Sequence, residues 1–233
     1  MRELLPRSSV DVGDLTATLR ADERMAPGRP WVLANMVSTL DGAASLDGRS
    51  GGIGGDGDRA LFAAVRSLAD LIVVGAGTAR AERYGPAASG APIAVVTSSL
   101  DLPDDLPLFE AARQGRAHPI VICPASSPQE RRDHLAGFAE VVTVDGDGVA
   151  PADIVAAATV AGARVVLCEG GPSLLAQFVA ADLIDEWFVT IGPMVASGTA
   201  PRILTGSGQD LRGVALSRVW EQDGTLFLRY LRP

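Results

Sequence analysis

The sequence predicts an α/β protein of three layers, with a mostly parallel central sheet, helices on both faces and a C-terminal antiparallel hairpin. The main observation is that short β-branched apolar runs alternate with helical patterns, as in parallel sheets buried on both faces. The last two strand patterns, 214–218 and 225–231, instead alternate polar and apolar residues, which is typical of an antiparallel edge pair. A length of 233 residues and a 47% share of hydrophobic residues suit one such domain.

The N-terminal segment, residues 1–29, is interrupted by Arg, Asp and Pro, so we expect an N-terminal arm with a short helix at 12–19. The apolar run at 31–37, broken by one polar residue, predicts a buried strand. Hydroxyl and carboxylate side chains follow in 38–42, at the carboxyl end of this strand. Open α/β sheets bind their ligands at that edge, so these residues are candidates for a site.

A glycine-rich loop at 48–57 holds six glycines in ten residues and is either a solvent-facing connector or a lid over a site. Asp58 is expected to open a helix that ends near Leu68. Arg59 and Arg66 are two turns apart and therefore lie on nearly the same face of that helix. Spacing alone favours a solvated polar face, and a phosphate site is the functional alternative.

The rest of the chain predicts further buried strands at 71–78, 92–97, 119–123, 141–144, 165–168 and 185–191. Helices are predicted at 127–135, 150–161 and 172–181, and a polar turn or short helix at 78–86. No repeat, low-complexity tract or linker divides these elements, so residues 30–233 are expected to form a single domain.

Composition excludes several function classes. A net charge of −8 and a pI near 4.8 argue against nucleic acid as a partner. Every one of the 20 basic residues is Arg, which rules out a lysine Schiff base and a P-loop lysine. The few His and Cys residues have no zinc-site spacing, so we expect no metal. No apolar run reaches the ~18 residues of a membrane span, and the N-terminus lacks the apolar core of a signal peptide, so we expect a cytoplasmic protein.

The most informative segment of the chain runs from Val165 to Leu175. In it an apolar strand pattern is followed directly by the residues Glu-Gly-Gly-Pro-Ser-Leu. Glycines at 170 and 171 allow a sharp turn, and Pro172 suits the first position of a helix. Backbone N–H groups at such a helix N-terminus can hold a phosphate. A tight turn without a ligand is the alternative, because short glycine motifs are common.

A second glycine turn follows the strand at 71–78, where Gly75-Ala76-Gly77-Thr78 matches half of a dinucleotide-binding fingerprint. Arg80 replaces the third glycine, and no acidic residue ends a second strand about twenty residues on, so a standard Rossmann unit is not favoured. Thr97 and Ser98 close the next strand and offer neutral hydrogen-bond donors at the same edge of the sheet.

Taken in order, these motifs resemble the reductase domain of the bifunctional riboflavin-biosynthesis deaminase/reductase, whose fold is that of dihydrofolate reductase. The resemblance covers roughly residues 30–231. It is carried by five segments: Thr39-Leu40-Asp41-Gly42, where the family usually shows Ser-x-Asp-Gly; Asp58-Arg59 with Arg66; 73–78; Glu169 to Leu174; and 183–186. The zinc deaminase half is absent from this sequence, so deamination is expected to belong to another protein.

The resemblance implies NADPH as hydride donor, with its pyrophosphate on the turn at 170–174. The cofactor-binding residues so implied are Gly75, Thr78, Glu82, Thr97, Ser98, Gly170, Gly171, Pro172, Ser173 and Leu174. Glu82 stands where the family commonly has Asp, and Ser99 stands where an arginine is frequent. We therefore expect NADPH to be preferred over NADH by a narrower margin than an arginine would give.

The resemblance also implies a phosphoribosylamino-pyrimidine substrate, with Arg59 on its phosphate and Glu169 at its polar groups, and a homodimer. The candidate substrate-binding residues are Asn35, Thr39, Asp41, Arg59 and Glu169. Asp41 and Glu169 are also the candidate catalytic residues, because reduction at the sugar C1 carbon is helped by a proton donor or acceptor near the ring oxygen. An Asp-Gly pair such as Asp41-Gly42 is equally ordinary turn chemistry.

Two other functions stay open at this point. One is reduction of a pterin such as dihydrofolate on the same fold, and the other is NADP binding without turnover. The expected dimer would use the strand at 185–191 and the edge hairpin, whose apolar residues include Trp187 and Phe188.

Overall fold

A computed structural model describes residues 1–5, 14–20, 22–206, 208 and 211–233. The first two residues of the helix expected at 12–19 lie outside the described residues, and α1 forms at Leu15–Arg20. Among the described residues, no helix is long and apolar enough to cross a membrane.

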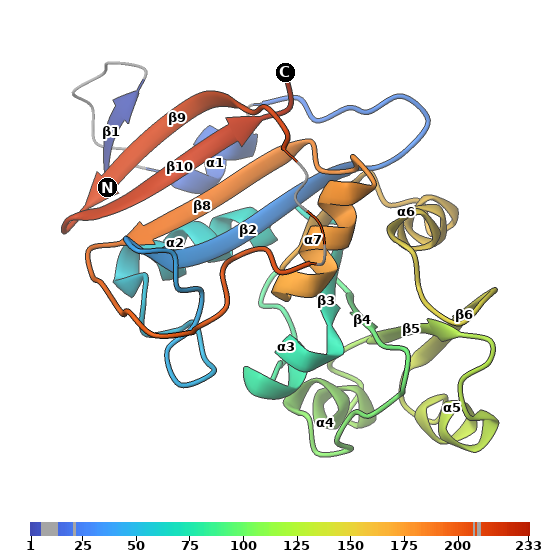
Figure 1. The fold of residues 1–233 in the computed structure, drawn as a ribbon. Helices are drawn as coiled ribbons and strands as arrows, with labels where there is room; N and C mark the ends of the chain where they lie inside the picture. The colour runs from blue at the N-terminus through green and yellow to red at the C-terminus, as the bar shows by residue number, and fades with distance from the viewer. Residues whose placement is uncertain (6–13, 21, 207, 209–210) are drawn as a thin grey trace.

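One ten-stranded sheet runs through the molecule in the order β1-β9-β10-β8-β2-β7-β3-β4-β5-β6 (Figure 1). Strands from β8 to β6 in this order are parallel, whereas β10, β9 and β1 continue the sheet in antiparallel fashion. The strands are β1 Arg2–Leu5, β2 Trp31–Thr39, β3 Leu71–Gly75, β4 Ile93–Val96, β5 Ile120–Pro124, β6 Glu140–Val144, β7 Val165–Cys168, β8 Glu186–Gly192, β9 Ala215–Gln222 and β10 Thr225–Leu231.

The helices cover both faces of this sheet. Besides α1 they are α2 Gly55–Arg66, α3 Ala76–Ala81, α4 Pro107–Arg113, α5 Gln129–Leu135, α6 Pro151–Val160 and α7 Pro172–Ala180. One hydrophobic core lies between the sheet and the helices α1 to α5, and a second lies between the sheet and the pair α6 and α7. The three-layer architecture predicted from the sequence, with its mostly parallel sheet and its C-terminal antiparallel strands, is therefore confirmed.

Several elements differ from the sequence prediction. The strand predicted at 71–78 ends at Gly75, because helix α3 begins at Ala76, and the strand predicted at 214–218 extends to Gln222. Strand β1 is formed by the N-terminal arm, because Arg2 pairs with Glu221 of β9, and the local sequence carries no signal for so distant a partner. Helix α4 was not predicted, since seven residues that begin at Pro107 are too few to show a helical period. Helix α2 begins at Gly55 instead of Asp58.

The early start of α2 has a packing reason. Gly57 lies inside the helix, although glycine costs about 1 kcal/mol there relative to alanine. A Cβ atom at Gly57 would lie 2.6 Å from Cζ of Phe227 on β10. The close approach of helix and sheet therefore requires a glycine, and tertiary packing overrides the helix propensity.

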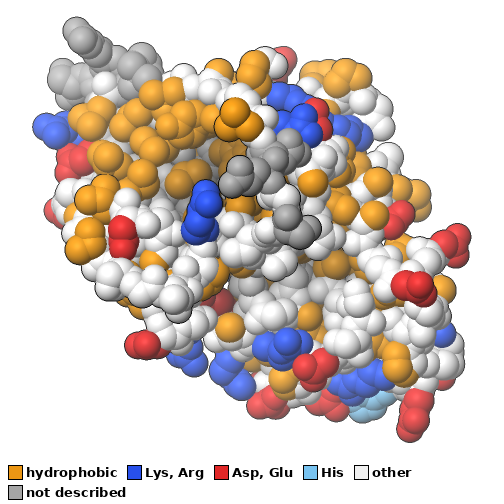
Figure 2. Space-filling model, in the orientation of Figure 1, with side chains coloured by type: hydrophobic (Ala, Val, Ile, Leu, Met, Phe, Trp, Pro, Cys, Tyr) orange, Lys and Arg blue, Asp and Glu red, His pale blue; other side chains and the backbone are white. Residues whose placement is uncertain are grey.

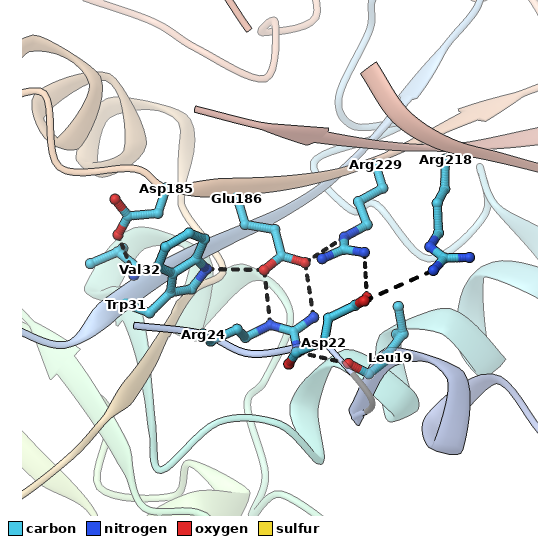
Figure 3. A network of polar contacts seen from close by, with 9 residues as sticks. All are labelled: Leu19, Asp22, Arg24, Trp31, Val32, Asp185, Glu186, Arg218 and Arg229. Carbon is cyan, nitrogen blue, oxygen red and sulfur yellow. Dashed lines mark hydrogen bonds and ion pairs between the residues drawn. The ribbon is translucent and has the colours of Figure 1, made fainter. Parts of the chain in front are cut away.

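Buried ion pairs attach the N-terminal segment to the sheet (Figure 3). Glu186, the first residue of β8, is fully buried and accepts hydrogen bonds from Arg24 and Arg229. The indole N–H of Trp31 donates to the same carboxylate over 3.0 Å. Beside it, both oxygens of Asp185 accept from Arg29, at 2.6 and 2.7 Å. The arm thus contacts the sheet closely, and a domain boundary between residues 29 and 30 stays a prediction.

No helix of the described residues covers the outer face of β8, β10 and β9. Cross-strand pairs such as Leu228 with Val189 and Tyr230 with Trp187 place apolar side chains on that face. Figure 2 shows hydrophobic side chains gathered at the upper left, where Figure 1 places β9 and β10. The expectation that Phe188 is also part of this surface is wrong, because Phe188 points to the opposite side and is fully buried in the core.

Candidate active site

A cavity of about 870 Å³ opens beside the carboxyl ends of β2, β7 and β3. Its wall is formed by β2, α2, the glycine-rich loop, α3 with the turn after it, and the turn that opens α7. The sequence-predicted residues that line it are Asn35, Arg59, Thr78, Glu82, Glu169, Gly171 and Pro172. Residues separated by more than a hundred positions in the chain are brought together here, at the edge where open α/β sheets bind ligands.

Glu169 is held by three hydrogen bonds at the wall of this cavity. The Arg66 guanidinium donates from Nε to Oε1 and from Nη2 to Oε2, both over 2.7 Å, and the Tyr84 hydroxyl donates to Oε2 over 2.7 Å. Glu169 is buried, and burial together with its carboxylate raises the pKa of the Tyr84 phenol well above its ordinary value. A carboxylate that accepts a bidentate guanidinium is stabilised as an anion.

This geometry bears on two expectations. The role expected for Arg66, a solvated or merely structural residue, is incomplete, because Arg66 both lines the cavity and fixes Glu169. Arg66 also stacks over Phe62, with 4.2 Å from its guanidinium carbon to the ring centroid. The catalytic role of Glu169 stays a prediction, and both of its carboxylate oxygens already accept hydrogen bonds from Arg66 and Tyr84.

A second carboxyl group lines the cavity from α2. Asp58 Oδ1 accepts a 2.6 Å hydrogen bond from the hydroxyl of Thr190, a fully buried residue of β8. Desolvation raises the pKa of Asp58, and the Thr190 hydrogen bond lowers it by less. Asn35 on β2 is 9% exposed, and its Oδ1 atom is buried without a hydrogen-bond partner among the described residues.

Arg59, the predicted phosphate ligand, lines the cavity from the next position on α2. Its side chain is 68% exposed and forms an ion pair with Asp56, one turn earlier on the helix. An exposed pair of this kind contributes little to stability and is easily exchanged. The guanidinium can therefore turn to a phosphate at the mouth of the cavity.

The glycine-rich loop contacts α3 through Glu82. Its Oε1 atom accepts hydrogen bonds from the backbone N–H and the hydroxyl of Ser50, at 2.7 and 2.9 Å. Both residues line the cavity. Of the two sequence alternatives, a solvent-facing connector or a cover over a site, the structure supports the second.

The glycine turn at 170–171 lies against the glycine turn after β3. The Gly75 N–H donates to the carbonyl oxygen of Gly170 over 2.7 Å, and the Gly170–Gly171 peptide is cis. A Cβ atom at Gly171 would lie 2.4 Å from Oγ1 of Thr78. Pro172 is the first residue of α7, as expected from the sequence. A helix N-terminus and the partly exposed Gly171 thus stand next to the cavity, which fits the pyrophosphate of a nucleotide cofactor.

The remaining predicted cofactor residues lie on the other side of this turn. A second cavity of about 560 Å³ is lined by Gly75, Thr97, Ser98, Ser173 and Leu174, among others. The Thr97 hydroxyl accepts the Leu100 N–H over 3.0 Å and shapes the loop after β4. The two cavities border on the same turn, so one extended molecule can contact both.

Thr39 and Asp41 are not brought into this arrangement, because neither lines the first cavity. The Thr39 hydroxyl donates to Asp41 over 2.5 Å, and the backbone N–H groups of Ala196 and Ser197 donate to the same carboxylate over 3.0 and 2.7 Å. These bonds, that of Thr39 first, lower the pKa of Asp41 to about 2. Asp41 thus fastens two loops together, and its catalytic role stays a prediction.

The sequence prediction missed Asp58 and Tyr84 as cavity residues. Asp58 was treated only as the start of a helix, and Tyr84 lay in a polar segment without a pattern. The partner of Asp58, Thr190, is 132 positions away, so no local signal joins them. The Asp58-Arg59 pair within a recognisable motif was the one available hint.

Comparisons with known proteins agree with this geometry. Residues 30–225 match the model of the family described as the RibD C-terminal domain. The chain is 29% identical over 199 residues to the riboflavin biosynthesis protein RibD of Bacillus amyloliquefaciens, of which it spans 51%. It is 30% identical over 190 residues to the 2,5-diamino-6-ribosylamino-4(3H)-pyrimidinone 5′-phosphate reductase of Methanothermobacter thermautotrophicus, covering 78% of this chain and 87% of that protein.

Solved structures show the same fold. A pyrimidine reductase-like protein of Corynebacterium diphtheriae superposes with a TM-score of 0.77 at 24% identity, over 87% of this chain and 91% of that one. The riboflavin biosynthesis reductase Rib7 of yeast superposes with a TM-score of 0.71 at 17% identity, over 94% and 99% of the two chains. At these identities the likeness establishes the fold and leaves substrate and cofactor to be argued from the site.

Proposed function

Because this chain belongs to the family of RibD C-terminal domains, we propose that it is an NADPH-dependent reductase of riboflavin biosynthesis. It converts a 5-phosphoribosylamino-pyrimidine to the ribitylamino product. The observation that carries the proposal is the cavity of about 870 Å³ with the glycine turn at 170–171 at its wall. The names of the archaeal relatives, which are pyrimidinone 5′-phosphate reductases, support the substrate class.

Family membership implies a reduced nucleotide cofactor, and the donor groups of this chain fit one. When bound, NADPH supplies a hydride to the substrate. The backbone at Gly171 and the first turn of α7 hold its pyrophosphate, next to Thr78. Thr97 and Ser98 lie in the second cavity and offer neutral donors, so the preference for NADPH over NADH is narrow.

The residues of the first cavity bind and orient the pyrimidine substrate. Arg59 exchanges Asp56 for the substrate phosphate, a charge-assisted contact at the cavity mouth. Glu169, fixed by Arg66 and Tyr84, provides a stationary negative charge that favours a developing iminium group at the sugar C1 carbon. The glycine-rich loop, fastened through Glu82, excludes water from the reacting atoms.

Reduction of a pterin is the second candidate. It is favoured by one observation: Arg59 is mostly exposed and already paired, whereas a pterin ring carries no phosphate that needs it. The deciding experiment is steady-state oxidation of NADPH by the purified full chain, with identification of the product. We expect turnover of a phosphoribosylamino-pyrimidine. If dihydrofolate is turned over efficiently and no pyrimidine nucleotide is reduced, the proposed function is wrong and pterin reduction takes its place. If NADPH binds but neither substrate is reduced, both reductase functions are wrong.

We also propose a homodimer that buries the outer face of β8, β10 and β9. Support comes from the apolar side chains on that uncovered face, such as Val189 and Leu228. Light scattering at micromolar concentration is expected to give twice the chain mass of 24.1 kDa. A cytoplasmic location and the lack of a nucleic-acid partner stay predictions from the sequence.

A further inference from the structure

The loop that follows β4 carries polar groups of the second cavity and is held in a strained conformation. Thr97 and Ser98 line that cavity. Leu100, two residues further on, is 1% exposed and has a φ of 56°, in the left-handed region that leucine rarely adopts. Its N–H donates to the Thr97 hydroxyl over 3.0 Å. Such strain persists only where surrounding contacts fix the backbone, and it is common at ligand-binding loops.

Helix α5 and the turn before it supply these contacts. The hydroxyl of Ser127, which is 6% exposed, donates to the carbonyl oxygen of Ser98 over 3.1 Å. The Arg131 guanidinium donates from Nε to the Leu100 carbonyl oxygen over 3.4 Å and from Nη2 to the Leu102 carbonyl oxygen. Three alternate carbonyl groups of the loop therefore accept side-chain donors from one element, and two of the three accept from Arg131.

Arg131 also pairs with a negative charge of the same loop. Its Nη2 atom donates to Asp104 Oδ1 over 2.7 Å, and this bond is the main reason why the pKa of Asp104 is lowered. Asp101 and Asp105 of this loop form ion pairs with arginines from α3 and the turn after it. Because carboxylates repel an anionic ligand, their pairing with arginines favours a phosphate group beside the loop. The Arg131–Asp104 pair is itself partly exposed, so it contributes little to overall stability.

We propose that Arg131 is a positioning residue for the nucleotide cofactor, although it lines neither cavity. It holds the loop in the conformation that presents Thr97 and Ser98 to the bound dinucleotide. The inference rests on the proposed function and adds to it a residue that does not touch the ligand. Without Arg131 the strained backbone at Leu100 relaxes, and only part of the population keeps the binding conformation. The apparent Kd then rises in proportion to the loss of that population.

Fluorescence titration of the purified full chain with NADPH tests this role. In Arg131→Ala the Kd for NADPH is expected to rise about tenfold, which corresponds to an ordered loop in about one tenth of the molecules. In steady-state turnover KM for NADPH should rise by a similar factor, whereas kcat and KM for the pyrimidine nucleotide should stay within about twofold. A residue that only stabilises the fold would not change KM for one substrate alone. The matched control is Arg132→Ala, because this next residue of α5 donates to Ala125 and Gln129. We expect it to change none of these constants.

Two further variants keep the test valid if Arg131→Ala does not fold. Arg131→Lys retains the charge, but a single ammonium group cannot reproduce the planar fork of the guanidinium, so NADPH affinity should lie between those of the parent and Arg131→Ala. Ser127→Ala removes the hydrogen bond to the Ser98 carbonyl oxygen and is expected to weaken NADPH binding about two- to tenfold.

Equal NADPH affinity in Arg131→Ala and Arg132→Ala overturns the inference, and so does an equal rise of KM for both substrates. If Arg131→Ala does not fold, unchanged affinity in both Arg131→Lys and Ser127→Ala overturns it. Turnover separates the inference from the proposed function. If NADPH binding weakens as expected but the parent protein reduces no pyrimidine nucleotide, the positioning role stands and the reductase function is wrong. If the nucleotide is reduced and every variant binds NADPH as tightly as the parent, the reductase function stands and the positioning role is wrong.

Discussion

The two ends of β8 carry buried polar groups on the same face of the strand, and the protein supplies hydrogen-bond partners fully at one end and incompletely at the other. At the first residue, Glu186 is fully buried and receives hydrogen bonds from two arginines and a tryptophan (Figure 3). Four residues later, Thr190 donates to Asp58, and Asn35 Oδ1 on the adjacent strand β2 is buried without a donor among the described residues. The first end is closed by the protein itself, and the second opens to a cavity.

The difference separates a group that stabilises the fold from groups that are ready for a ligand. A buried carboxylate that is fully paired stabilises one arrangement of the chain, here the attachment of the N-terminal segment to the sheet. Buried acceptors without donors are tolerated where a bound molecule completes them. Substitutions at the two ends are therefore expected to affect different properties.

The largest effect is expected at the closed end. Glu186→Gln leaves Arg24 and Arg229 without their shared anion, and both side chains are 5% exposed. Removing one member of such a buried network costs about 3–5 kcal/mol. Urea denaturation measures this loss. The control is Asp105→Asn, which breaks an exposed pair with Arg83 and is expected to cost less than about 1 kcal/mol. Equal losses in the two variants would contradict the distinction between the buried and the exposed pair.

Arg59→Ala is expected to act at the open end without affecting stability. A bidentate contact to phosphate contributes about 1.5–3 kcal/mol, so KM for the phosphorylated substrate should rise roughly ten- to a hundredfold. The affinity for NADPH should not change. The control is Arg116→Ala, which removes an exposed arginine that donates to Gln114 and lines neither cavity. An unchanged KM in Arg59→Ala would remove Arg59 from the substrate site.

The glycine turn is tested by Gly171→Ala. The new Cβ atom would lie 2.4 Å from Thr78 Oγ1, so the single variant introduces a clash within the protein. The same methyl group also fills the space that the cofactor pyrophosphate needs, and the single variant cannot separate the two effects. In the double variant with Thr78→Ala the clash is removed, and Thr78→Ala alone is the matched control. We expect NADPH affinity in the double variant to stay at least about tenfold below that of the control. Fluorescence titration with NADPH measures it, and recovery to the level of the control would place the pyrophosphate elsewhere.

Thr190→Val tests the open end of β8 with an isosteric change. Asp58 loses the hydrogen bond from Thr190 but keeps access to the cavity, so the expected cost is only about 0.5–1.5 kcal/mol. Thermal unfolding measures it beside Glu186→Gln. If Thr190→Val loses as much unfolding free energy as Glu186→Gln, the polar groups at the two ends of β8 contribute equally to stability and the distinction is wrong.

The smallest effect is expected for Asp41→Asn, and it depends on pH. The pKa of Asp41 is lowered from 3.8 to about 2, so its carboxylate stabilises the folded chain above the ordinary pKa and ceases to do so as pH falls through the folded value. The variant should therefore be less stable than the parent at neutral pH, and the two should converge toward pH 2. A difference in unfolding free energy that is constant with pH would contradict the sign of this shift.

Much of the fold could be predicted from the sequence because its signals are local. The apolar run at 71–75 and the strand before Glu169 are recognisable from consecutive residues, as are Pro172 at the start of a helix and the alternating pattern of the last strand. The glycine turn at 170–171 was recognised for the same reason. Its position beside the cavity agrees with the prediction, since the carboxyl ends of parallel strands meet at one edge.

What the sequence by itself determined is thus the order of the elements, the class of sheet and the segments that end at its ligand-binding edge. Only the tertiary structure decided which polar groups at that edge find partners. Glu169 is paired with Arg66 and Tyr84, and Asp41 is bonded to the backbone of a second loop away from the cavity. Asp58 accepts from Thr190, and Asn35 Oδ1 is buried without a partner among the described residues. The physical reason is that hydrogen-bond satisfaction depends on contacts between residues far apart in the chain, whereas secondary structure depends mainly on neighbours.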